Sequence, residues 1–191
     1  MKKSLCLLSA FLVALTLTAC NRSRNDYKEE LLNAMNSKVP FVSSDSKNVY
    51  LKDYQIPDLN EKYDFSPFEY TFVDFDNDEI KELVVKDEKQ NYYQIFHYDE
   101  KLRSIYGYTV GVRSLIELKT DGTFMQSSGA GINSINKLHF ENGKIVFDEL
   151  AFQNDYENQY KIDGEFVNKK DINAYFNKWG VSTDSKWIKI K

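Results

Sequence analysis

Three turn signals in the second half of the chain constrain its fold most strongly. Thr120-Asp121-Gly122, Asn142-Gly143 and Asp163-Gly164 each follow a run of apolar, β-branched and aromatic residues. Asp-Gly and Asn-Gly pairs supply the backbone angles that tight hairpins require, so they predict antiparallel neighbouring strands. The strands that we expect are Phe68–Val73, Ile80–Lys86, Tyr92–Tyr98, Arg103–Val112, Leu115–Leu118, Thr123–Ser127, Ile135–Phe140, Lys144–Leu150, Gln159–Ile162 and Lys186–Ile190.

Helical periodicity is found only near the two ends of the exported part. Asp26 is placed to cap a helix that runs to about Ser37, and Asn168 is placed to cap a second helix that stops at Gly180. Between them, Pro40 and a serine-rich cluster predict a loop over Val39–Asn48. The elements together predict an α+β fold, an antiparallel meander sheet with an N-terminal and a C-terminal helix.

The first twenty residues carry an export signal. Lys2 and Lys3 precede the largely apolar run Leu5–Leu17, which is shorter than the roughly 20 residues of a membrane-spanning helix. The following Leu17-Thr18-Ala19-Cys20 resembles the lipobox of bacterial lipoproteins. The resemblance implies cleavage before Cys20 and a lipid on its thiol. We therefore expect a signal peptide over residues 1–19, a lipidated tether over 20–25 and a single exported domain over 26–191.

Composition excludes several classes of protein. The signal takes two lysines with it, so the net charge falls from −4 to about −6, which does not favour nucleic acid as a partner. Cys6 leaves with the signal and Cys20 is consumed by lipid, so no thiol remains for a disulfide, a zinc–cysteine site or a cysteine nucleophile. Attachment to the membrane is then expected through the acyl chains rather than through a basic patch.

The densest chemical signal is the acidic loop, residues 74–82. Its spacing resembles the DxDxDGxxD/E calcium loops of dockerins and integrin-type β-propeller repeats, here between two expected strands. Calcium takes six to eight oxygen ligands. The expected ligands are the side chains of Asp74, Asp76, Asp78 and Glu82 and the carbonyl of Ile80.

Two features of the acidic loop depart from related motifs. Glu79 stands at the usual glycine position, where a positive φ costs a non-glycine residue about 1 kcal/mol. Val85 stands where an EF-hand needs a bidentate glutamate, so the EF-hand pattern does not apply. A solvated acidic turn is the alternative to a structural calcium ion. Crowded carboxylates with only Lys81 nearby favour a cation.

The mature chain as a whole is similar to uncharacterised surface lipoproteins of low-GC Gram-positive bacteria. The similarity rests on the acidic loop, on the string from Leu118 to Phe124 and on Ser127-Ser128-Gly129-Ala130. It implies an exported, lipid-anchored domain and supplies no activity.

Other candidate residues are weaker. Ser127, Ser128 and Gly129 form a small flexible segment that is either a ligand-contacting loop or a strand bulge, since no phosphate-binding motif follows it. His97 and His139 each lie in an expected strand beside aromatic residues, and we interpret both as strand residues rather than metal ligands. The tyrosines between Tyr92 and Tyr108 either pack in the sheet or form a platform for a sugar or a peptide.

Two functions follow as hypotheses. The first is a non-enzymatic binding module on the extracytoplasmic face of the cell membrane, with a glycan, a peptide or cell-wall material as ligand. The alternative is a hydrolase of envelope polymers with acidic catalytic residues, for which the sequence shows no motif.

Overall fold

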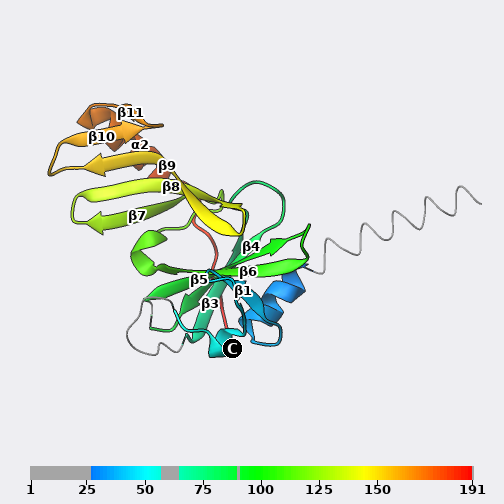
Figure 1. The fold of residues 1–191 in the computed structure, drawn as a ribbon. Helices are drawn as coiled ribbons and strands as arrows, with labels where there is room; N and C mark the ends of the chain where they lie inside the picture. Colours follow the sequence, from blue (N-terminus) through cyan, green and yellow to red (C-terminus); the bar gives the residue numbers. More distant parts are fainter. Residues whose placement is uncertain (1–26, 57–64, 90, 191) are drawn as a thin grey trace, which may run out of the picture.

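A computed structural model describes residues 27–56, 65–89 and 91–190 (Figure 1). Asp26 and Cys20, the expected helix cap and lipidation site, lie outside these residues. The N-terminal helix is described over 27–35, with Leu31 and Ala34 fully buried. No helix within the described ranges is long and apolar enough to cross a membrane.

The first sheet lies at the lower centre of Figure 1 and has the strand order β12-β3-β4-β5-β6-β1-β2. Its pairs are antiparallel except β1–β6, which is parallel. Two short 3₁₀ turns, η1 (Leu51–Asp53) and η2 (Val112–Ser114), flank it. The strands are β1 (Phe41–Ser43), β2 (Asn48–Val49), β3 (Pro67–Val73), β4 (Glu82–Asp87), β5 (Tyr92–Asp99), β6 (Ser104–Gly111) and β12 (Ile188–Lys189).

The second sheet is wholly antiparallel and has the order β11-β10-β9-β8-β7. The helix α2 (Lys169–Gly180) packs against it through Ile172 and Trp179. Asn168 caps α2 as expected, because its side chain accepts the Asp171 amide. The strands are β7 (Phe124–Gly129), β8 (Ile132–Glu141), β9 (Lys144–Asn154), β10 (Gln159–Ile162) and β11 (Glu165–Phe166).

The first sheet buries both of its faces. Leu83 and Val85 pack towards the N-terminal helix, whereas Val84 packs towards the second sheet. We call the latter set the inter-sheet core, since Leu138 of β8 joins it. Its members are Val73, Phe75, Val84, Tyr93, Ile95, Tyr108, Leu115, Leu118, Phe124 and Leu138.

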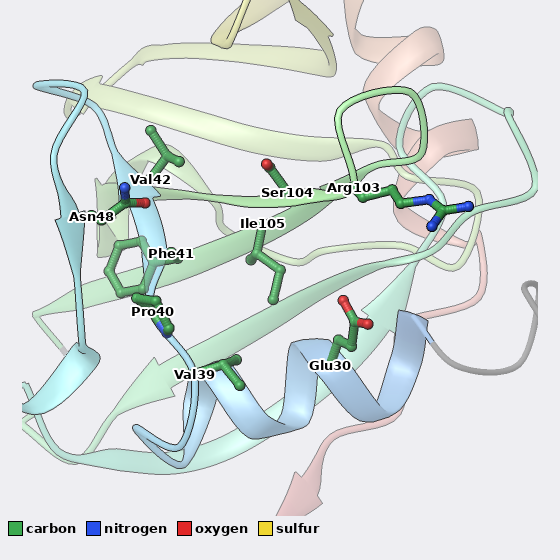
Figure 2. A pocket seen from close by; sticks show the side chains of 9 residues that line it. All are labelled: Glu30, Val39, Pro40, Phe41, Val42, Asn48, Arg103, Ser104 and Ile105. Atoms are coloured by element: carbon green, nitrogen blue, oxygen red, sulfur yellow. The ribbon is translucent and has the colours of Figure 1, made fainter.

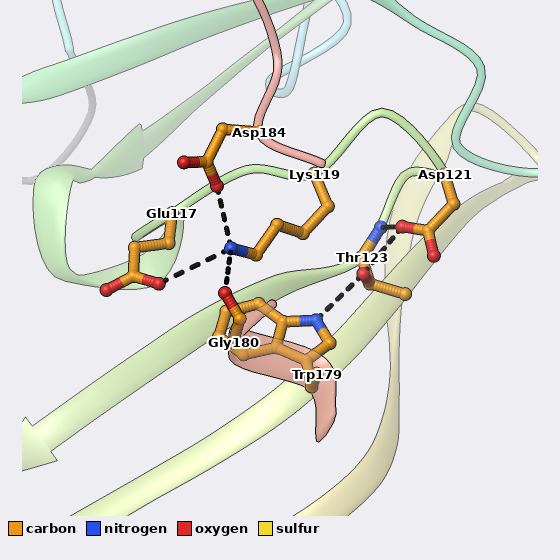
Figure 3. Close-up of polar contacts among 7 residues, drawn as sticks. All are labelled: Glu117, Lys119, Asp121, Thr123, Trp179, Gly180 and Asp184. Carbon is orange, nitrogen blue, oxygen red and sulfur yellow. Dashed lines mark hydrogen bonds and ion pairs between the residues drawn. The ribbon is translucent and has the colours of Figure 1, made fainter. Parts of the chain in front are cut away.

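A buried lysine holds the segment after α2 in place (Figure 3). The Lys119 ammonium lies 2.6 Å from the Asp184 carboxylate and 4.6 Å from the centre of the Trp179 ring. The indole of Trp179 donates to the hydroxyl of Thr123 at 2.9 Å. These three contacts hold the segment that leaves α2 on the second sheet and leads back to β12 in the first sheet.

The expected α+β fold, with antiparallel sheets and a helix near each end, is confirmed. Two local expectations were wrong. Val39–Asn48 contains the strand β1 and the first residue of β2 instead of only a loop. Leu115–Leu118 is not a strand, because Glu117 has φ +50° and both leucines turn into the inter-sheet core.

The parallel pair β1–β6 depends on one close contact between Phe41 and Gly107. The Phe41 ring is buried and packs edge-on against Phe96 at 5.1 Å. A Cβ atom on Gly107 would lie 2.3 Å from the Phe41 ring and 2.7 Å from the Gln94 amide nitrogen. The strand β6 therefore needs a residue without a side chain at this position.

We expect Gly107→Ala to lower the free energy of unfolding by about 1–3 kcal/mol, because the new methyl group overpacks the core around Phe41. Gly111→Ala is the matched control, since no atom lies within 4 Å of its Cβ position. The control should unfold at the same denaturant concentration as the wild type or slightly above it. Equal stability of the two variants would contradict this packing.

Candidate functional site

The acidic loop connects β3 to β4 and is anchored in the core by Phe75. Phe75 is fully buried in the inter-sheet core and packs edge-on against Phe124 at 6.1 Å. A Cβ atom on Gly122, whose φ is +80°, would lie 2.7 Å from the Asp74 carbonyl. The turn before β7 therefore packs directly against the acidic loop.

Three of the expected ligand side chains come together. Asp74, Asp76 and Asp78 each offer a carboxylate oxygen, and these oxygens lie within 4.8 Å of one another. Asp74 accepts the Glu79 amide at 3.2 Å and Asp78 accepts the Ile80 amide at 2.7 Å. The Oδ1 atoms of Asp74 and Asp76 are buried, and neither has a hydrogen-bond partner among the residues that the structure describes.

Two residues of the acidic loop have a backbone conformation that usually favours glycine. Glu79 has φ +72° and Asn77 has φ +62°, both in the left-handed region. The glutamate at the glycine position therefore does not prevent this conformation, although it costs about 1 kcal/mol.

Crowding and burial act on the charges of the acidic loop. Burial raises the pKa of the Asp76 carboxyl above its usual value, and the neighbouring Asp78 carboxylate raises it further. The ionised form of the Asp76 carboxyl is therefore destabilised relative to its protonated form. A cation between the three aspartates would remove that cost.

Glu82 is not part of this cluster of oxygens. Its side chain is fully buried, and Oε2 accepts the Phe75 amide at 3.1 Å while Oε1 lies 3.0 Å from Nδ1 of His97. Burial raises the pKa of the Glu82 carboxyl well above its usual value, against the opposing effect of the Phe75 amide. Burial lowers the pKa of the His97 imidazole, although the nearby Asp76 carboxylate opposes that shift.

Sequence reasoning missed the Glu82–His97 pair. The two residues face each other from the paired strands β4 and β5, where Leu83 aligns with Phe96. The strand pairing of the two segments is the only signal that could have found it, because residues adjacent to an aligned pair are cross-strand neighbours.

The remaining candidates have ordinary structural surroundings. β7 bulges between Ser127 and Gly129, and the Ser127 hydroxyl donates to the Gly129 carbonyl at 3.2 Å. Ser128 is exposed, and a ligand at this segment stays a prediction. His139 pairs with Asp148 at 2.7 Å on the surface. Tyr93 and Tyr108 are buried, and the other tyrosines of that stretch are partly buried.

A separate cavity of about 370 Å³ lies between the N-terminal helix, β1 and β6 (Figure 2). Val39, Phe41 and Ile105 give it apolar walls, while Glu30 and Arg103 bring opposite charges to it. The Ser104 hydroxyl already donates to the Leu102 carbonyl.

Comparisons with known proteins yield no relative. No protein-family model matches the chain, and searches of curated proteins and of solved structures find no match.

We expect Glu82→Gln to flatten the pH dependence of stability in the presence of a chelator. The pKa of Glu82 in the folded state lies above its value of about 4.3 in the unfolded state. At a pH between these two pKa values, the folded state therefore binds more protons than the unfolded state. Wild-type stability should therefore fall as the pH rises from about 4 through the folded pKa. The glutamine variant should lack that part of the fall.

Denaturant unfolding of both proteins over a pH series measures the difference. Glu100→Gln, at an exposed residue, should keep the wild-type slope. A Glu82→Gln profile parallel to the wild type would contradict the shifted pKa.

Proposed function

We propose that this chain is a lipoprotein held at the extracytoplasmic face of a cell membrane by lipid on Cys20. Its folded domain is a non-enzymatic binding module for a glycan, a peptide or cell-wall material. A structural calcium ion occupies the acidic loop.

The observation that carries the calcium part is the pair of buried oxygens on Asp74 and Asp76, which have no hydrogen-bond partner within the described part of the chain. A buried polar atom without a partner costs about 1–3 kcal/mol, so such atoms call for a water or an ion. Hard carboxylate oxygens of this spacing suit calcium. Asp78 would complete the charged ligands, and the Ile80 carbonyl remains a predicted fourth ligand.

Glu82 has a different role in this proposal than the sequence pattern predicts. Its two carboxylate oxygens already contact the Phe75 amide and His97, so Glu82 restrains the backbone of the acidic loop instead of binding the ion. Waters would then supply the ligands that bring calcium to six or more oxygens. A site with three carboxylates and several waters is expected to be weak, with Kd of order 10⁻⁴–10⁻³ M as in extracellular calcium modules.

The ion would act on the fold through Phe75. Asp74 and Asp76 are its direct neighbours, and Phe75 lies in the core between the two sheets. Bringing the carboxylates together around calcium therefore restrains the residue that joins the sheets. A structural role is supported in preference to a catalytic one.

We expect calcium to raise the melting temperature of the full-length protein in detergent. At a calcium concentration of about one hundred times Kd, the stabilisation is about 2.7 kcal/mol, or about 5–10 °C for a domain of this size. Magnesium should do less, because it keeps its water and demands octahedral geometry.

Asp76→Ala should abolish the calcium increment and should melt above the wild type in chelator, since one repelling carboxylate is gone. Glu100→Ala, at an exposed residue outside the acidic loop, should keep the full increment. Equal shifts with the two metals, or a calcium increment retained by Asp76→Ala, would rule out the site.

The lipid anchor has its own test. Cys20→Ala should lose palmitate label and cleavage, because the modified thiol is absent. Cys6→Ala should retain both, since Cys6 lies inside the signal that is removed. Metabolic labelling in a lipoprotein-processing bacterium measures this, and label kept by Cys20→Ala would refute the lipobox assignment.

A further inference from the structure

A second cavity lies where the two sheets meet at their hairpin ends. It has a volume of about 570 Å³ and is lined by the β5–β6 hairpin on one side and the β8–β9 hairpin on the other. Small-molecule sites are usually about 300–1,000 Å³. We call this cavity the hairpin cleft. Its two sides are about forty residues apart in the chain, so no local sequence pattern indicates the cleft.

Aromatic rings from both sheets form the walls of the hairpin cleft. The His97 ring stacks on Phe140 at 3.9 Å, and Tyr108 lies 5.5 Å from Phe140. The turn at Gly143 presses on the Tyr106 ring, since a Cβ atom there would lie 3.2 Å from that ring. These contacts hold the rings in place, so the walls are formed before any ligand arrives.

Two polar groups in the hairpin cleft have unused hydrogen-bonding capacity. Tyr108 is 4% exposed, and its hydroxyl is buried with no partner among the described residues. His97 directs Nδ1 to Glu82, which leaves Nε2 as the only other hydrogen-bonding atom of the ring. Nε2 donates or accepts a hydrogen bond according to the tautomer of the ring.

The charges at the hairpin cleft balance. Asp99 and Lys101 both line it and have opposite signs. Asp99 already accepts the amides of Lys101 and Leu102, both at 2.9 Å. An anion or a cation therefore gains little there, whereas a neutral molecule with hydroxyl groups and an apolar face meets both the rings and the polar atoms.

We propose that the hairpin cleft binds a neutral polyhydroxylated ring, a unit of a glycan. The apolar face of the ring packs against the aromatic walls, and its hydroxyls bond to the Tyr108 hydroxyl and to Nε2 of His97. This assignment rests on the proposed function as a binding module and gives that module its site and its ligand class.

The test uses the full-length protein in detergent and three neutral disaccharides: chitobiose, cellobiose and maltose. Calorimetric titration should detect binding of at least one of them. Tyr108→Phe should weaken that binding about tenfold, as expected for one lost hydrogen bond, without lowering the melting temperature. A merely structural tyrosine would not separate affinity from stability in this way.

Two further variants locate the site. Tyr106→Ala removes a wall and should also weaken binding about tenfold, whereas Tyr156→Ala, an aromatic residue 71% exposed and outside the hairpin cleft, should bind as the wild type does. No binding of any of the three disaccharides would overturn the assignment. Binding that both cleft variants retain would also overturn it, while leaving the binding-module proposal in place. Palmitate labelling and calcium melting test the lipid anchor and the calcium site of the proposed function separately.

Discussion

The burial of Phe75 between the two sheets is the constraint on which the rest of the structure depends. Its ring fills the inter-sheet core beside Phe124, and its amide donates to the buried Glu82 carboxylate. Phe75 thus ties the second sheet to the middle of the first by a side chain and a backbone group at once. Asp74 and Asp76 flank Phe75 in the chain, and their carboxylates lie close together with that of Asp78.

Glu82 extends this constraint across the molecule. A buried carboxylate needs hydrogen-bond donors, and here the Phe75 amide is one partner and His97 is the other. The His97 ring then stacks on Phe140 of the second sheet. One connected path of contacts therefore runs from the acidic loop to the hairpin cleft. The ion and the ring that we propose would bind at its two ends.

Local chemistry explains which elements could be predicted. The cap at Asn168 and the strand Gln159–Ile162 were predicted correctly, because a cap and a turn depend on residues a few positions apart. The strands β1 and β2 were missed, because they are short and β1 depends on the fit of Phe41 over Gly107, more than sixty residues away. Leu115–Leu118 was mistaken for a strand because its apolar residues suggested one. In the structure both leucines instead turn into the same inter-sheet core.

The amino-acid sequence by itself determined the α+β class, the positions of most strands and the spacing of the three aspartates. Turn chemistry, side-chain period and residue spacing are properties of short segments, so they hold wherever the segments lie. The division of the strands into two sheets, the pairing of Glu82 with His97 and the cleft shared by Tyr108 and Phe140 arise from long-range packing. Those pairings join distant residues, and they arise from packing the sheets around Phe75, which no local pattern encodes.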